Sequence, residues 1–309
     1  MKSRKSNWIQ IGILAVLGLA VILSLVIPQV FRGRASPQLL SLSVMLRDTD
    51  SSGWTTARQG MEQAADELGA ELRFLTLTTP NDSAEQEILF LREIEGGAAA
   101  LVAVPADPSA LSAALEQWLV VCPTVTLESP MEGAAGVVSP DNPALGRQLA
   151  EALLEDWNGG EVLLLDTAGP CSGITGRLEA AEAALAGAGV PARRIQTLPE
   201  EAALWVMAFE PAATQRAAEK KESEERGFAL YGVGTSAAIT ACLERGSITA
   251  MAAWSDYAAG YLAVRRAVEA ARGEAGTLSA LPFSILRGED IYAPENQKLL
   301  FPIMSSSSR

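Results

Sequence analysis

From residue 40 onward, short apolar runs of strand length alternate with longer segments in which apolar residues recur at helical spacing. Strands are predicted over residues 40–46, 71–77, 98–104, 124–127, 161–165, 194–198, 204–208, 229–233 and 248–252. Helices are predicted over residues 55–68, 82–96, 108–118, 143–157, 175–186, 212–221, 237–245 and 256–271. Because apolar strands that alternate with helices form parallel sheets covered on both faces, we expect an α/β fold. The 309 residues are enough for about two such domains.

The N-terminal segment has a different composition. Residues 7–31 carry no charge, and the apolar run 8–30 is long enough to cross a hydrocarbon core of about 30 Å. Three basic residues precede it: Lys2, Arg4 and Lys5. This arrangement predicts a cytoplasmic N-terminus, with the rest of the chain outside the membrane. We expect residues 1–36 to be an uncleaved membrane anchor; the alternative is a secretory signal cleaved after Ala35.

The charge of the chain excludes one class of partner. The sequence has 24 Lys and Arg against 37 Asp and Glu, a net charge of −13. Five of the basic residues precede residue 35, so the rest of the chain has a charge of −18, from 19 basic and 37 acidic residues. Such a surface repels phosphate backbones, and we expect no nucleic-acid partner.

Histidine is absent from the sequence, which removes the commonest general base and metal ligand. We therefore expect no catalytic activity, no cofactor and no metal. The cysteines are too sparse for a disulfide framework: Cys122, Cys171 and Cys242. Cys171 lies in a Gly-Pro-Cys-Ser-Gly loop and is expected to be accessible. An enzymatic alternative would rest on Cys171 or Ser172 alone, and the sequence shows no partner to activate either.

The loops that follow the predicted strands are rich in polar residues. Ligands of doubly wound sheets bind outside the carboxyl ends of the strands, where such loops lead into helices. The loops that meet this condition are 47–54, 78–82, 105–107, 128–130, 168–175, 209–211 and 232–236. Asp, Asn, Ser and Gly also form turns and helix caps, so the loops predict a site as a set rather than one by one.

Three motifs at these loops carry a resemblance to a known family. They are a polar loop from Asp48 to Trp54, the turn Thr-Pro-Asn-Asp-Ser-Ala-Glu-Gln at 79–86, and Val-Ser-Pro-Asp-Asn-Pro-Ala-Leu-Gly at 138–146. The sequence resembles the periplasmic binding proteins of the ribose-binding type over nearly all of residues 39–303. The resemblance implies two doubly wound parallel-sheet lobes joined by three crossings of the chain. The crossings are placed near Asp141, Trp254 and Leu286. Lobe 1 would comprise 37–141 and 254–285, lobe 2 would comprise 142–253 and 286–303, and 304–309 would be a disordered tail.

The resemblance also implies a set of ligand contacts. These are Asp50, Ser51, Trp54, Asp82, Glu128, Asn142, Arg177, Glu210, Gly234 and Trp254. In sugar binders an aromatic ring stacks on the sugar, while carboxylates, Asn and Arg bind its hydroxyls. Each residue also has a structural interpretation. Asp82 could cap its helix, Arg177 could pair with an acid on the helix surface, and the tryptophans could belong to the core.

The sequence departs from the sugar-binding pattern at several of these positions. Glu128 stands where the family has Asp, Glu210-Pro211 replaces Asn-Asp, Gly234 replaces Asp, and Trp254 replaces Gln. We therefore expect the scaffold to be kept and the ligand chemistry to be altered, so that the ligand could be a larger glycan, a modified sugar or an amino-bearing solute.

We expect an extracytoplasmic solute-binding protein that closes over a sugar-like ligand. Its partner would be the membrane permease of an ATP-driven importer, or a membrane sensor kinase or chemoreceptor. The alternative is a degenerate scaffold that acts as a membrane-tethered interaction or sensory module and binds no small molecule.

Overall fold

The protein is described by a computed structural model that covers residues 39–49, 52–117, 122–167, 169–200, 204–277 and 279–301. The predicted anchor, Asp50, Ser51 and the predicted tail lie outside the described residues. Among the helices of the described ranges, none is long and apolar enough to cross a membrane. From Leu40 onward the chain forms one unit.

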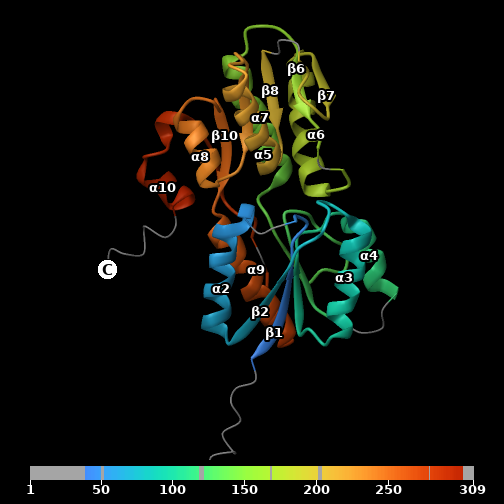
Figure 1. Ribbon diagram of the computed structural model, residues 1–309. Coiled ribbons are helices and arrows are strands. Elements are labelled where there is room, and N and C mark those ends of the chain that lie inside the picture. Colours follow the sequence, from blue (N-terminus) through green and yellow to red (C-terminus); the bar gives the residue numbers. More distant parts are fainter. Residues whose placement is uncertain are drawn as a thin grey trace, which may run out of the picture. The chain divides into compact units, whose positions relative to one another are not determined.

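The first lobe is built on a parallel sheet of five strands in the order β2-β1-β3-β4-β5. The strands are β1 (Leu40–Met45), β2 (Ala70–Leu75), β3 (Ala100–Ala103), β4 (Thr124–Leu127) and β5 (Gly136–Val138). The helices are α2 (Thr55–Leu68), α3 (Ser83–Glu95), α4 (Pro108–Gln117) and α9 (Asp256–Ala271), with the short 3-10 helix η1 (Ser52–Trp54) before α2. Helices α2 and α9 pack together beside the sheet, and α3 and α4 lie together on its other side (Figure 1).

Two glycines permit the close packing of α2 on α9. A β-carbon at Gly60 would lie 2.0 Å from the carbonyl oxygen of Tyr257, and one at Gly260 would lie 1.9 Å from that of Ala57. Both distances are far below contact range, so the helix backbones touch where these glycines meet. This contact ties α9 to the first lobe, although α9 follows strands of the second lobe in the sequence.

The second lobe is built on a six-stranded sheet in the order β11-β10-β9-β8-β6-β7. The strands are β6 (Val162–Leu165), β7 (Ala192–Ile195), β8 (Trp205–Ala208), β9 (Ala229–Val233), β10 (Ala250–Trp254) and β11 (Phe283–Leu286). The helices are α5 (Asn142–Asp156), α6 (Ser172–Gly187), α7 (Pro211–Ser223), α8 (Ala237–Glu244) and α10 (Pro294–Leu300), with the 3-10 helix η2 (Gly288–Asp290). Helix α5 packs on α6, and α7 packs on α8 (Figure 1).

The α/β alternation predicted from the sequence is confirmed, and the differences concern short or edge strands. Four elements have the predicted bounds: Thr55–Leu68, Thr124–Leu127, Ala229–Val233 and Asp256–Ala271. Strand β5 was not predicted, because three residues that include a glycine are too few to show a periodicity. Strand β11 was also missed; it runs antiparallel to β10, so the second sheet is not purely parallel. Strand β10 lies at 250–254 rather than at 248–252.

The chain passes between the sheets three times, after β5, after β10 and after α9. The last crossing differs from the one predicted near Leu286. Phe283 already pairs with Trp254 in the second sheet, and Leu281 forms an isolated bridge with Pro140. Residues 283–285 and Trp254 therefore belong to the second sheet, not to lobe 1 as predicted. The partly buried residues of β11 gave no clear strand signal in the sequence.

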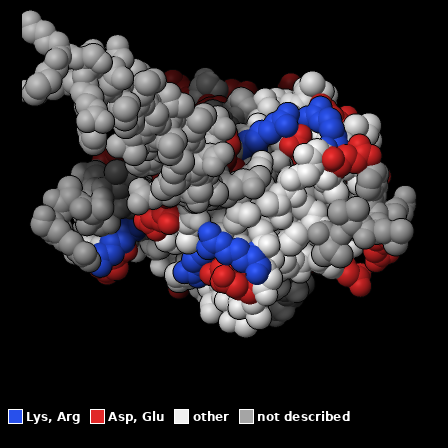
Figure 2. Space-filling model, turned by 90° about the horizontal axis from the view of Figure 1, so that it is seen from below, with Lys and Arg blue, Asp and Glu red and all other residues white. Residues whose placement is uncertain are grey.

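Charges on the described surface are interspersed in sign. On the face seen in Figure 2, the basic side chains lie beside acidic ones and do not form a basic patch. The pair Arg58–Glu62, at 2.8 Å on α2, is one such exposed contact.

Candidate ligand-binding site

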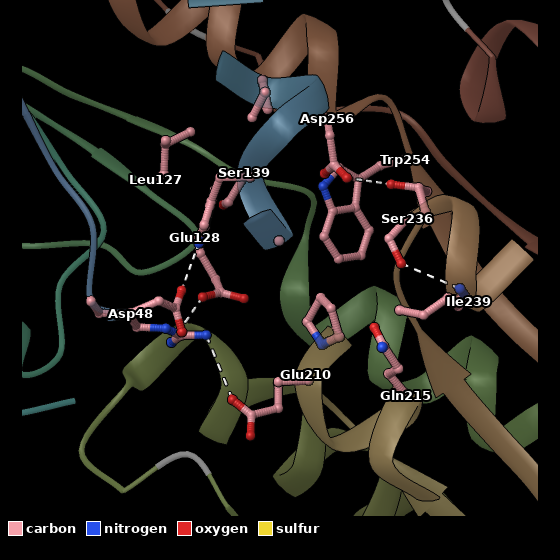
Figure 3. A pocket seen from close by; sticks show the side chains of 18 of the residues that line it. Asp48, Leu127, Glu128, Ser139, Glu210, Gln215, Ser236, Ile239, Trp254 and Asp256 are labelled. Atoms are coloured by element: carbon pink, nitrogen blue, oxygen red, sulfur yellow. Dashed lines mark hydrogen bonds and ion pairs between the residues drawn. The ribbon is translucent and has the colours of Figure 1, made fainter. Parts of the chain in front are cut away.

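A cavity of 530 Å³ lies between the two lobes, at the carboxyl ends of their strands. Its walls come from the loops that follow β1, β2, β4 and β5 in the first lobe and β6, β8, β9 and β10 in the second (Figure 3). A volume of this size is within the range of small-molecule sites, roughly 300–1,000 Å³. The cavity is where the polar loops of the sequence predict a ligand.

Four buried charged residues join the lobes on one side of the cavity. Arg47 and Glu128 follow β1 and β4 of the first lobe, whereas Arg177 on α6 and Glu210 after β8 belong to the second. Glu128 forms ion pairs with both arginines. Its Oε1 lies 3.2 Å from Arg177 Nη1, and its Oε2 lies 3.0 Å from Arg47 Nη1. Arg47 Nη2 also lies 3.6 Å from Glu210 Oε2 (Figure 3). We refer to these four residues as the bridging cluster.

The surroundings shift the pKa values of the two arginines of the bridging cluster in opposite directions. Burial disfavours the charged Arg47 guanidinium, but the nearby Glu128 and Glu210 outweigh it and raise the pKa of Arg47 above its usual value. Burial lowers the pKa of Arg177, and Glu128 offsets part of that effect. Since an arginine pKa starts above about 12, both side chains remain cations at neutral pH.

The Arg177 guanidinium contacts four groups, and one of its nitrogens, Nη2, has no hydrogen-bond partner among the described residues. The side chain is 0% exposed. Its Nε donates to Asn142 Oδ1 at 2.7 Å, and its Nη1 donates to the Phe209 carbonyl oxygen at 3.0 Å. The guanidinium carbon lies 5.0 Å from the centre of the Trp254 ring. Arg177 Nη2 has no hydrogen-bond partner within the described residues, and the residue lines the cavity.

The opposite corner of the cavity contains a carboxylate without a cation. Asp256, at the start of α9, accepts a hydrogen bond from the Thr235 hydroxyl and is also a neighbour of the Trp254 indole, which acts on it as a donor. Asp256 keeps some accessible surface because it faces the cavity, and protein surrounds it otherwise (Figure 3). Burial raises the pKa of Asp256 to about 6, and the hydrogen bonds from Thr235 and Trp254 offset part of that rise.

A second indole and carboxylate lie on the first-lobe wall. Trp54, at the end of η1, donates from its Nε1 to Asp48 Oδ2 at 2.6 Å. Both residues line the cavity. Trp54 is partly exposed and packs against the hydrophobic core, so one indole serves both the core and the cavity wall.

The N-terminus of α6 lies directly against the first lobe. Gly173 N donates to Ser129 Oγ at 3.0 Å, and a β-carbon at Gly173 would lie 2.2 Å from the Glu128 carbonyl oxygen. Arg47 Nη1 donates to Cys171 Sγ at 2.9 Å. Cys171 was expected to be accessible, which is wrong: it is fully buried, and burial raises the pKa of its thiol. A buried and protonated thiol is a poor nucleophile, which weighs against the enzymatic alternative.

Five of the predicted contacts line the cavity: Trp54, Glu128, Arg177, Glu210 and Trp254. Three others do not. Asp82 caps α3 by accepting from Glu85 N at 3.0 Å, which was its structural interpretation. Asn142 lies behind the wall and donates to the Glu128 carbonyl oxygen at 2.8 Å. Gly234 has a φ of 129°, and its neighbours Thr235 and Ser236 line the cavity in its place.

Sequence reasoning missed several charged and polar residues of the wall: Arg47, Asp48, Arg216, Thr235 and Asp256. The predicted ligand loops 47–54 and 232–236 contain Arg47, Asp48 and Thr235, but the list of individual contacts left these residues out. Arg47 and Asp48 follow β1, Thr235 follows β9, and Asp256 comes two residues after β10. The structure confirms Asp256 as the first residue of the predicted helix 256–271, but the strand before it was predicted to end at 252 instead of 254, and the connection between the two was not among the predicted ligand loops.

Two α/β lobes with an intervening cleft and three crossings define a bilobal binding protein. Residues 42–205, more than half of the chain, match the periplasmic binding protein domain family, and the chain belongs to that family. No curated protein matches the chain.

Similar solved structures include two sugar complexes. A carbohydrate transporter solute-binding protein from Agrobacterium radiobacter, in complex with D-arabinose, is 16% identical with a TM-score of 0.76, over 86% of this chain and 100% of that one. An ABC transporter solute-binding protein from Agrobacterium vitis, with bound D-fucose, is 15% identical with a TM-score of 0.74, over 84% and 100%. The XylFII–LytSN complex gives 15% identity and a TM-score of 0.69, over 82% and 100%. These likenesses establish the fold.

Proposed function

We propose that the protein is an extracytoplasmic solute-binding protein whose lobes close over a small, sugar-like ligand. The observation that carries this proposal is the 530 Å³ interlobe cavity, whose lining residues include a fully buried arginine with a nitrogen that is unpartnered among the described residues. A buried polar group without a partner costs about 1–3 kcal/mol, and a ligand oxygen that accepts from Arg177 Nη2 would recover that cost. The similar structures in complex with D-arabinose and D-fucose support a sugar as the ligand class.

The roles of the wall residues follow from their chemistry. Trp54 and Trp254 offer apolar ring faces for a sugar, and Arg177, Glu128 and Glu210 offer groups for its hydroxyls. We include Asp50 and Ser51 as contacts because they belong to the loop that leads into Trp54. Asp82, Asn142 and Gly234 would act from behind the wall, by holding the loops that carry it.

We further propose that residues 1–36 anchor the protein, which places the lobes on the outer face of the cytoplasmic membrane, with signal cleavage as the alternative. Membership of the periplasmic binding protein family supports an extracytoplasmic location. The closed lobes would be recognised by a permease of an ATP-driven importer, as the transporter context of the similar structures supports. Recognition by a membrane sensor kinase or chemoreceptor is the other form of the proposal.

The bridging cluster favours a second function, a scaffold that binds no small molecule. Arg47 pairs with Glu128 of its own lobe and with Glu210 of the other. Two carboxylates that could bind a ligand are therefore already paired with a group of the protein. In this case the lobes would act as an interaction or sensory module at the membrane.

A thermal-shift screen tests the two functions. The full chain, in detergent, is heated with neutral monosaccharides, oligosaccharides, nucleosides, amino sugars and polyamines. A ligand at a hundredfold excess over its Kd stabilises the folded state by about 2.7 kcal/mol. We expect one class to raise the Tm, and we expect Trp54→Ala to abolish the rise, whereas Trp157→Ala, at a tryptophan that does not line the cavity, keeps it. A folded protein with no response to any class would support the scaffold.

A further inference from the structure

The charges of the cavity wall are not evenly paired. The basic lining residues are Arg47, Arg177 and Arg216, and the acidic ones are Asp48, Glu128, Glu210 and Asp256. All three arginines form ion pairs with Glu128 or Glu210. Among the described residues, Asp48 and Asp256 form no ion pair and accept hydrogen bonds from neutral donors. The wall therefore has one negative charge in excess and two carboxylates without a cation in contact.

The fold does not require the charge of Asp256, the carboxylate at the start of α9. The N-cap of α9 is Ser255, whose Oγ accepts from Ala258 N at 3.2 Å. The Asp256 carboxylate is thus free of the usual capping task of an acid at a helix start. Its neighbours come from the second lobe, where Thr235 follows β9 and Trp254 ends β10. Burying an ionised carboxylate with neutral donors alone costs free energy, which a cation at the same place would offset.

The Trp254 indole connects this corner to Arg177. The Arg177 guanidinium lies 5.0 Å from the centre of the indole ring, while the indole acts as a hydrogen-bond donor to Asp256. Arg177, which has an unpartnered nitrogen, and Asp256, which has no cation in contact within the described ranges, therefore both neighbour the Trp254 indole and line the same cavity. A monosaccharide with an amino substituent carries both complementary groups on one ring, an ammonium group for the carboxylate and oxygens for the guanidinium.

We propose that the ligand is an amine-bearing sugar, whose ammonium group pairs with Asp256 while a ring or hydroxyl oxygen accepts from Arg177 Nη2. The inference rests on the proposed function, and it narrows the ligand class of the same cleft. A neutral sugar would leave Asp256 without a cation, and a simple amine would leave Arg177 without an acceptor.

Matched ligands test the inference. Isothermal titration of the full chain at pH 7 compares D-glucosamine, D-galactosamine and D-mannosamine with their neutral parents and with their N-acetyl derivatives, which keep the nitrogen but lose the charge. We expect at least one amino sugar to bind about tenfold or more tightly than both of its neutral counterparts. Equal binding of the three forms would overturn the inference and leave a sugar-binding function standing. A folded protein that binds none of them would overturn the inference, whereas the proposed function fails only if the thermal-shift screen also shows no response to any solute class.

Matched variants test the residue. Asp256→Asn keeps the shape of the side chain and should remove the preference for the charged amine. Asp141→Asn makes the same change at the first crossing, where Asn is an equally good helix cap and the residue does not line the cavity, so the preference should be kept. An amine preference that survives Asp256→Asn would overturn the assignment.

A second measurement covers the case in which Asp256→Asn does not fold. Thr235→Val removes a donor to the Asp256 carboxylate without removing its charge. Because the carboxylate then depends more on the ligand cation, the ratio of amine to N-acetyl binding should stay at tenfold or above. A ratio that falls to one in this variant would contradict the inference.

Discussion

The two sides of the cavity use buried charge differently. In the bridging cluster, the carboxylates of Glu128 and Glu210 meet guanidinium groups, and the contacts run between the lobes. Around Asp256, a carboxylate of the crossing into α9 meets a hydroxyl and an indole. The first arrangement is satisfied mostly by the protein itself and determines how the lobes meet. The second leaves a charge open to the cavity, which is the condition expected of a ligand contact.

The largest effect should come from breaking the bridging cluster. Glu128→Ala leaves two buried arginines without their shared carboxylate, so we expect the free energy of unfolding to fall by about 3–5 kcal/mol. Glu62→Ala is the matched control, because it breaks an exposed pair with Arg58 and should cost at most about 1 kcal/mol. Urea denaturation of both variants checks the difference. Similar losses in the two would contradict the structural role given to the cluster.

The next effect concerns the contact of α6 with the first lobe. In Gly173→Ala the new methyl group would meet the Glu128 carbonyl oxygen, and overpacking of this kind costs about 1–3 kcal/mol. We expect a lower Tm and faster labelling of Cys171, which the same contact buries. Gly176→Ala is one helical turn further on, where a β-carbon meets nothing within 4 Å, and it should stabilise α6 by roughly 0.5–1 kcal/mol. Unchanged Cys171 labelling in Gly173→Ala would show that the contact does not hold the lobes.

A smaller effect should appear in the pH dependence of stability. The charged and hydrogen-bonding groups that act on Asp256 are Glu128, Arg177, Thr235 and Trp254. Burial raises the pKa of Asp256 from 3.8 to about 6, so between these values the folded state binds more protons than the unfolded state. Stability from this group is therefore highest below pH 4 and falls as the pH rises to about 6.

The variant Asp256→Asn removes this titration. It should be more stable than the wild type by about 1–2 kcal/mol at pH 7, with the advantage fading towards pH 4. Chemical denaturation of both proteins at several pH values measures this difference in the free energy of unfolding. An advantage that does not change with pH would assign the effect to packing instead of charge. A bound amine should reverse the sign, because a cation favours the ionised carboxylate.

The smallest effect is expected at the rim of the cluster. Arg216 lies 3.6 Å from Glu210, and its side chain is 64% exposed. Exposed pairs contribute about 0–1 kcal/mol, so Arg216→Gln should change the free energy of unfolding by less than about 0.5 kcal/mol. A loss comparable to that of Glu128→Ala would mean that the bridging cluster extends to the solvent.

Much of the fold was predictable because its signals are local. The helix at Thr55–Leu68 has apolar residues at helical spacing and ends at Gly69, whose φ of 70° a glycine adopts without strain. Asp82 and Asp141 mark helix starts in the same way, and both cap their helices. Strands β5 and β11 were not predictable, because their pairing partners, and not their own residues, make them strands.

The site was predictable as a set of loops and unpredictable as a set of contacts. Trp54, Glu128, Arg177, Glu210 and Trp254 lie on the cavity as the resemblance implied. That Arg47 bridges the lobes depends on a carboxylate 163 positions away at Glu210, and no spacing in the chain encodes that distance. The same holds for Cys171, which its loop sequence marks as accessible and the first lobe buries.

By itself, the sequence determined the α/β class, the two lobes, the family and the edge of each sheet where a ligand would bind. Periodicity, helix caps and strand-end loops each depend on residues that are close together in the sequence, so the sequence alone shows them. The tertiary structure alone decided which charges meet. Three arginines form ion pairs with two glutamates, whereas Asp256 lines the cavity without an arginine of the described chain in contact. Electrostatic pairing depends on distance in space between residues far apart in the chain, and folding sets that distance.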